Sequence, residues 1–278
     1  MNHLPTILSA ALLLTACSEE ESSPPTSPPG DGATPVIVLV HGAWHTPTQW
    51  EALGAALDAR GLEWVAVDLP SAGPEFGTRL EPTGEEVATV PLLSADVART
   101  VEVLDSLDRP SVLVGHSYGG FVLSQAGHHP NVEHLVYLCA FVPEPGESLV
   151  DLASAPPIAP IVGALRLSED RLLLSIDPEM APFVFYGDLS DAAATAATEK
   201  LVPSIALTFD EPAGHPAWKS VPSTMVRCLD DNAIHPDRQA QMGAKLDQTI
   251  DLPSSHSPFL SRPEDVADIL DTIARSAP

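Results

Sequence analysis

Ser117 stands in the pattern Gly-x-Ser-x-Gly, which is typical of a serine that acts as a nucleophile. The apolar run 111–114 precedes it and the apolar run 121–126 follows, which predicts a buried strand that turns sharply into a helix. Gly115 and Gly119 lack the Cβ atoms that would collide in so tight a turn. We therefore expect an exposed Ser117 hydroxyl at a helix N-terminus, where backbone N–H groups favour developing negative charge.

A serine hydroxyl is a poor nucleophile at neutral pH, so it needs a base and a third group that orients the base. Ten histidines compete for the role of base. His256 is the best candidate because it lies in a polar turn between a late strand and the final helix, and because the base comes last in the order nucleophile, acid, base. Asp230 and Asp231 both follow an earlier strand. We favour Asp231 as the acid, since Asp230 directly follows that strand and could instead serve the turn.

The oxyanion that develops during acyl transfer needs two backbone N–H donors. Tyr118, the residue after the nucleophile, is expected to supply one, and Ala43 in the loop after the first strand is expected to supply the other. His116 flanks the nucleophile, and we expect its side chain to point away from the site.

His128, His129 and His134 lie around a predicted helix end, where we expect surface or capping roles. His215 and His235 are expected in ordinary loops, with a place in the wall of the pocket as the alternative. No carboxylate or cysteine spacing completes a metal site around them, so no metal is expected, and the chemistry described above calls for no cofactor.

The charge of the chain excludes one class of partner. The 13 Lys and Arg residues against 38 Asp and Glu give a formal net charge of −25. Such acidity repels nucleic acid, so no nucleic-acid partner is expected. With 278 residues, 44% of them hydrophobic, the chain is long enough for one sizeable α/β domain with an insertion.

Strand-like and helix-like segments alternate along most of the chain. Strands are predicted at 36–40, 63–68, 111–114, 132–142, 224–229 and 249–252. Helices are predicted at 47–60, at 237–245 and from 261 to about 275, and two more begin near 94 and 121. This alternation predicts a doubly wound, mostly parallel α/β sheet with the chemistry at the carboxyl ends of the strands. The alternation stops between 143 and 222, where a Pro- and Ala-rich segment without clear strand pairs predicts a helical cap.

The N-terminal segment predicts export. Residues 4–16 form an apolar run that has the length of a signal-peptide core, and the run ends in Leu14-Thr15-Ala16-Cys17. This ending resembles a bacterial lipobox, in which the cysteine is lipidated, although Met1-Asn2-His3 carries no Lys or Arg. We expect 1–17 to be a signal peptide with a lipid at Cys17. Plain secretion and an uncleaved apolar tail remain alternatives.

The amino-acid composition changes after Cys17. Residues 18–33 are rich in Ser, Pro, Glu and Gly, which predicts a disordered linker, and the folded domain is expected at 34–278. Contact with a membrane is expected only through the lipid at Cys17. The protein would then be an exported, membrane-anchored lipoprotein.

Two further cysteines, Cys139 and Cys228, lie in apolar strand-like runs. Export would permit a disulfide between them. Because no small disulfide framework is visible, we expect two buried free thiols.

Five short segments carry a resemblance to a known family: His41-Gly42-Ala43-Trp44, Gly115-His116-Ser117-Tyr118-Gly119-Gly120, Ala140-Phe141-Val142-Pro143, Asp230-Asp231-Asn232-Ala233-Ile234 and Ser255-His256-Ser257-Pro258-Phe259. Together they resemble the α/β-hydrolase superfamily, and within it the small serine esterases related to plant methyl esterases and hydroxynitrile lyases. The resemblance implies the α/β-hydrolase fold with a helical cap inserted after the sixth strand. It also implies a triad of Ser117, Asp231 and His256, with the amides of Ala43 and Tyr118 as oxyanion hole.

The same resemblance separates two activities. Lyase members carry a Thr after the His of the oxyanion loop and a Lys directly after the catalytic His, where this chain has Gly42 and Ser257, so the lyase alternative is disfavoured. The expected function is a serine carboxylesterase that hydrolyses small to medium apolar esters through an acyl-enzyme. A non-catalytic, surface-anchored binding protein with the same fold is the alternative. The natural substrate and the oligomeric state stay open.

Overall fold

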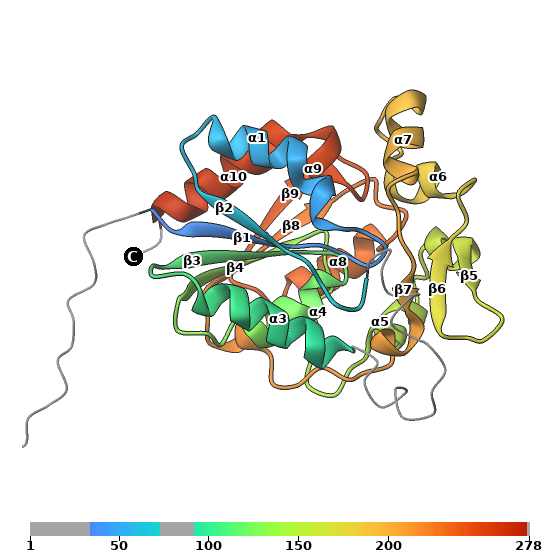
Figure 1. Cartoon of the computed structure of the whole chain (residues 1–278), viewed down its shortest axis with the longest axis horizontal. Coiled ribbons are helices and arrows are strands. Elements are labelled where there is room, and N and C mark those ends of the chain that lie inside the picture. Colours follow the sequence, from blue (N-terminus) through green and yellow to red (C-terminus); the bar gives the residue numbers. More distant parts are fainter. Residues whose placement is uncertain (1–33, 73–91, 277–278) are drawn as a thin grey trace, which may run out of the picture. The chain divides into compact units, whose positions relative to one another are not determined.

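Six parallel strands form the central sheet of the computed structural model, which describes residues 34–72 and 92–276 (Figure 1). Their order across the sheet is β2-β1-β3-β4-β8-β9. The strands are β1 (Val36–Val40), β2 (Trp64–Val67), β3 (Ser111–His116), β4 (Val132–Leu138), β8 (Ser223–Cys228) and β9 (Gln248–Leu252). Every neighbouring pair runs parallel, so the predicted parallel sheet is confirmed.

Helices cover both faces of this sheet (Figure 1). One face carries α1 (Glu51–Asp58), α9 (Pro258–Ser261) and α10 (Pro263–Ser276), and the other carries α3 (Leu93–Asp105), α4 (Gly119–Ala126) and α8 (Pro236–Gly243). In β1, Ile37 and Leu39 pack in the core beneath α1 and α10, while Val38 and Val40 pack in the core beneath α3 and α4. Burial on both faces makes such strands continuous apolar runs, and the predicted doubly wound arrangement is confirmed.

The cap contains a small sheet, which the sequence analysis missed. Its elements are α5 (Leu149–Ser154), β5 (Leu165–Leu167), β6 (Leu173–Ile176), α6 (Ala181–Phe185), α7 (Asp191–Thr198) and β7 (Ser204–Ile205). The strands pair antiparallel in the order β5-β6-β7, so the prediction of a helical cap without strand pairs was wrong. Strands of two to four residues are too short to show an alternating pattern. The cap follows β4, the fourth strand in chain order, rather than the sixth.

Cys139 and Cys228 are joined by a disulfide, which corrects the prediction of two free thiols. Cys139 follows β4 and Cys228 ends β8, and these neighbouring strands bring the two Cα atoms to 5.4 Å. That separation lies within the range of protein disulfides. The pairing could not be recognised from sequence because the cysteines are 89 positions apart and only the sheet order makes them neighbours.

The N-terminal predictions concern residues 1–33, which lie outside the described residues, as does the segment 73–91. The signal peptide, the linker at 18–33 and the lipid at Cys17 therefore stay predictions. Within 34–72 and 92–276, no helix has the length and apolar character needed to cross a bilayer.

Removal of the disulfide should destabilise the fold. We expect the double change Cys139→Ser and Cys228→Ser to lower the free energy of unfolding by about 2–5 kcal/mol, because the bond restrains a long loop of the unfolded chain. Urea unfolding of the variant and the parent measures this difference. Alkylation before reduction, followed by peptide mass spectrometry, is the direct check. If both cysteine peptides were alkylated in the unreduced parent, the disulfide would be disproved.

Candidate active site

Ser117 occupies the corner between β3 and α4 in a left-handed backbone conformation, with φ of 53°. A Cβ atom on Gly115 would lie 2.6 Å from the Gly119 carbonyl oxygen, and one on Gly119 would lie 2.7 Å from the Val40 carbonyl oxygen. Both distances are shorter than non-bonded atoms tolerate, so the sharp turn requires glycine at both positions. Ser117 is 8% exposed, less than the sequence analysis expected, because the cap covers the corner.

Asp231 and His256 form a buried pair above the carboxyl ends of β8 and β9. The Nδ1 atom of His256 donates to Oδ2 of Asp231 at 2.7 Å, and neither side chain is more than 1% exposed. The backbone N–H groups of Ala233 and Ile234 donate to Oδ1 of Asp231 at 2.7 and 2.9 Å. Asp230, the alternative acid, is exposed. The structure therefore brings Asp231, and not Asp230, to His256.

The second ring nitrogen of His256 is free to take a proton. Because the Asp231 carboxylate only accepts hydrogen bonds, Nδ1 carries the hydrogen and Nε2 carries a lone pair. Nε2 is buried and has no hydrogen-bond partner among the described residues, so its bond to the Ser117 hydroxyl is not formed in this structure. Such catalytic hydrogen bonds are often long before a ligand binds.

His116 lies beside His256 rather than away from the site, which corrects the expectation for its side chain. Its Nε2 donates to the backbone oxygen of His256 at 2.8 Å, and the two ring centres are 4.5 Å apart. Since Ser117 follows His116 in the chain, this contact holds the His256 turn next to the nucleophile corner. Burial, and then the neighbouring rings of His256 and His45, lower the pKa of His116 well below its usual value.

Ala43, Ser117 and Tyr118 line one cavity of about 270 Å³. The backbone N–H groups of Ala43 and Tyr118 donate to no acceptor within the described ranges. These two amides are the donors that the sequence predicts for an oxyanion hole, which needs backbone N–H groups near the serine hydroxyl. Much of the remaining wall comes from apolar residues of the cap, among them Leu149, Val150, Ala153, Ile158, Ile161, Val162, Leu165 and Leu174.

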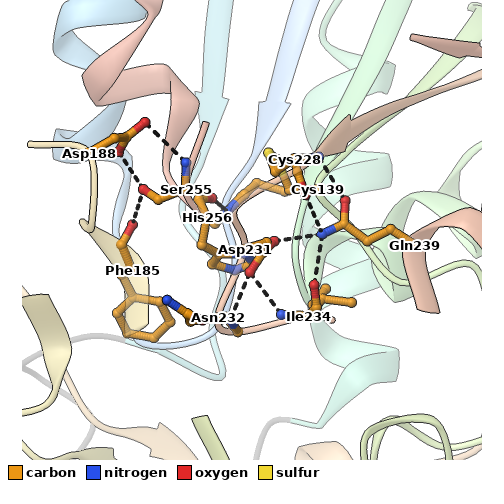
Figure 2. Close-up of polar contacts among 12 residues, drawn as sticks. Cys139, Phe185, Asp188, Cys228, Asp231, Asn232, Ile234, Gln239, Ser255 and His256 are labelled. Atoms are coloured by element: carbon orange, nitrogen blue, oxygen red, sulfur yellow. Dashed lines mark hydrogen bonds and ion pairs between the residues drawn. A yellow bond between two sulfur atoms is a disulfide. The ribbon is translucent and has the colours of Figure 1, made fainter. Parts of the chain in front are cut away.

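Gln239 contacts the acid, and the sequence analysis missed it (Figure 2). It is fully buried on α8, and its Nε2 donates to Oδ2 of Asp231 at 2.7 Å and to the Ile234 backbone oxygen at 2.8 Å. Its Oε1 accepts from the Cys228 N–H at 2.9 Å. Nothing in the local sequence distinguishes this glutamine from the exposed Gln241 on the same helix.

A second missed contact connects the base to the cap (Figure 2). Asp188, between α6 and α7, accepts hydrogen bonds from the backbone N–H and the hydroxyl of Ser255. The Ser255 hydroxyl also lies 3.2 Å from the Phe185 backbone oxygen. Ser255 directly precedes His256, so the cap helps to fix the position of the imidazole.

The structure offers one grouping of metal-ligand residue types in its described part, formed by Cys139, Cys228 and Asp231. The two sulfur atoms are bonded to each other, so neither is a thiolate that could bind a metal ion.

Comparison with known proteins assigns the fold to a family. The sequence model of the Alpha/beta hydrolase family matches residues 37–269. The chain belongs to the alpha/beta hydrolase family. A pyrethroid hydrolase of Sphingobium wenxiniae is 29% identical to this alpha/beta hydrolase over 252 residues, which are 84% of this chain and 85% of that protein. Methylesterase 1 of Arabidopsis thaliana is 32% identical over 111 residues, 38% of this chain and 40% of that protein.

A solved structure of a pyrethroid hydrolase agrees with this alpha/beta hydrolase at a TM-score of 0.73 and 24% identity, over 87% of this chain and 98% of that one. That likeness shows the shared fold. The family model and the sequence relatives confirm the predicted resemblance to small esterases, and the chain is a hydrolase with relatives that are named as esterases.

Replacement of Gln239 should weaken catalysis by letting the acid move. In Gln239→Leu, Asp231 loses the side-chain donor that fixes its Oδ2 atom, so the carboxylate orients the imidazole of His256 less firmly. We expect kcat for an ester to fall about tenfold with KM within about twofold of the parent. The matched control is Gln241→Leu on the same helix, which should keep the parent kcat. If the two variants had equal kcat, Gln239 would have no role in positioning the acid.

The buried histidines should make the fold acid-labile. Burial lowers the pKa of His41 to about 4 and that of His45 to about 3, while the unfolded chain titrates at 6.5. Their contribution to stability is therefore present above pH 6.5 and is lost as the pH falls toward these values. Each should remove about 2 kcal/mol of unfolding free energy between pH 7 and pH 5.

Urea unfolding at the two pH values measures this loss. His45→Gln should reduce the difference between pH 7 and pH 5, because one protonation site of the unfolded chain is removed. His128→Gln, on the exposed surface, is the matched control. An unchanged difference in His45→Gln would contradict the assignment.

Proposed function

We propose that the chain is a serine carboxylesterase that hydrolyses small to medium, uncharged apolar esters. The observation that carries this proposal is the convergence on one cavity of the Ser117 hydroxyl and two unengaged amides, beside the hydrogen-bonded pair of Asp231 and His256. Membership of a hydrolase family with esterase-named relatives supports it.

The residues have distinct roles in the proposed reaction. The Ser117 oxygen attacks the ester carbonyl carbon while Nε2 of His256 takes the hydroxyl proton, and Asp231 stabilises the imidazolium that forms. The N–H groups of Ala43 and Tyr118 bind the oxyanion of the tetrahedral intermediate. Collapse of this intermediate expels the alcohol, which takes the proton from His256, and leaves an acyl group on Ser117. Water then attacks the acyl group by the same steps and releases the acid.

The cavity supports an uncharged, apolar substrate. Among the residues that the structure describes, no side chain that lines it is charged, and its volume of about 270 Å³ is at the small end of ligand pockets. A substrate carboxylate would lose its hydration there without gaining a cationic partner, which is costly. One relative is named as a pyrethroid hydrolase and another as a methylesterase, and the second name is consistent with an ester substrate.

The lyase alternative is disfavoured by Gly42. A Cβ atom at this position would lie 2.8 Å from Cβ of Ser117 and 2.9 Å from Nδ1 of His116, so the Thr of lyases does not fit without rearrangement. A non-catalytic binding protein is the second candidate, because the same cavity would hold an apolar ligand. The unengaged amides and the free Nε2 of His256 favour catalysis, since simple binding of an apolar ligand does not require them.

Paired aspartate variants test the proposal. Asp231→Asn should lower kcat for a short-chain p-nitrophenyl ester by about 10⁴-fold, because the imidazole loses its tautomer and orientation. Asp230→Asn, one residue earlier and exposed, should stay within about twofold of the parent, as expected for a surface change. Ser117→Ala should abolish both hydrolysis and covalent labelling by a fluorophosphonate probe. If the folded parent were never labelled, the binding protein would be favoured.

A further inference from the structure

Trp44, the neighbour of the proposed oxyanion donor Ala43, is attached to the cap at three points. Its backbone N–H donates to the Ser204 hydroxyl oxygen at 2.9 Å, and its indole N–H donates to the Leu174 backbone oxygen at 2.8 Å. Its own backbone oxygen accepts from the Val202 N–H at 3.0 Å. Leu174 in β6 pairs with Ser204 in β7, so a single strand pair of the cap holds this part of the loop.

The backbone of Trp44 explains why the loop needs such support. Its φ of 62° lies in the left-handed region, which is unfavourable for a large side chain. A residue in this conformation keeps it only where surrounding contacts impose it. The hydrogen bonds to β6 and β7, together with ring contacts to Phe185 and Phe209 of the cap, are those contacts.

The second oxyanion donor is connected to the same cap strand by another route. The Ile205 N–H of β7 donates to the Ser71 backbone oxygen at 3.1 Å. Ser71 donates through its backbone N–H and its hydroxyl to the Asp96 carboxylate, at 2.9 and 2.6 Å. The Tyr118 hydroxyl donates to the same carboxylate at 2.7 Å.

This second connection is buried along its length. Asp96 is fully buried and Ser71 and Tyr118 are each 2% exposed, so water does not compete for these bonds. Burial, and then the Asp96 charge, raise the pKa of Tyr118 well above its usual value, so its hydroxyl remains a donor. Because Tyr118 also supplies a backbone N–H to the oxyanion hole, a fixed ring limits the movement of that amide.

We propose that strand β7 of the cap, through Ser204 and Ile205, is a positioning element that holds both amides of the oxyanion hole in place. The proposal rests on the esterase function above and adds a second task for the cap, which otherwise provides apolar walls for the substrate. Oxyanion holes act through donors that are fixed before the reaction begins. A loosened β7 therefore weakens stabilisation of the transition state more than it weakens substrate binding.

Ser204→Ala tests the proposal because it removes only the oxygen that accepts from the Trp44 N–H. We expect kcat for a p-nitrophenyl ester to fall about tenfold with KM within about twofold of the parent, as for loss of an interaction made in the transition state. An aryl trifluoromethyl ketone, which forms a tetrahedral adduct with the serine, should bind about tenfold more weakly, in proportion to kcat. The matching trifluoromethyl carbinol should bind with unchanged affinity.

Two serine variants are the controls. Ser204→Thr keeps the hydroxyl on a β-branched residue that suits a strand and should recover most of the parent kcat. Ser175→Ala removes a serine of the neighbouring strand β6 whose hydroxyl donates to the Arg166 backbone oxygen and to no other described residue, and kcat should equal that of the parent. Thermal unfolding of all three variants separates the effect on catalysis from loss of fold.

Tyr118→Phe is the second variant, and it cuts the connection through Asp96 while leaving the backbone amide. As for Ser204→Ala, we expect a loss of kcat and of affinity for the trifluoromethyl ketone, with KM within about twofold of the parent. If folded Ser204→Ala and Tyr118→Phe both matched Ser175→Ala in kcat and ketone affinity, the role of β7 would be disproved. A parent without Ser117-dependent ester hydrolysis would instead overturn the proposed function, and this inference with it.

Discussion

The buried hydrogen bond between Asp231 and His256 requires several segments of the fold to be in fixed positions. An ionised carboxylate that is removed from water is costly unless donors surround it. Asp231 has four donors: the amides of Ala233 and Ile234, the side-chain amide of Gln239, and the imidazole of His256. They come from the turn after β8, from α8 and from the turn after β9. The positions of these three segments are thus fixed by the needs of one carboxylate.

What the sequence predicted correctly was local in origin. The turn at Ser117 follows from glycines two residues to either side, and the central strands are apolar because each is buried on both faces. The five segments that resemble α/β hydrolases are likewise short and contiguous. Such signals survive in a single sequence because the residues that cause them are neighbours in the chain.

What the sequence did not reveal depends on contacts between distant segments. Gln239 is a ligand of Asp231 only because α8 packs against β8, and Asp188 reaches Ser255 only because the cap folds over the β9 turn. Trp44 likewise bonds to two residues of the cap that are distant in sequence. Leu174 and Ser204 lie 130 and 160 positions after it. Hydrogen-bond partners at these separations leave no periodicity, so no pattern predicts them.

The disulfide has a topological consequence for the cap. Its two cysteines lie just before and just after the insertion, so residues 143–222 belong to a covalently closed ring whose junction sits on the sheet beside Asp231. The chain segments that enter and leave the insertion therefore stay together even if the cap moves. A single protease cut inside this ring would leave the two fragments joined by the disulfide, and they would separate only after a reductant opened the bond.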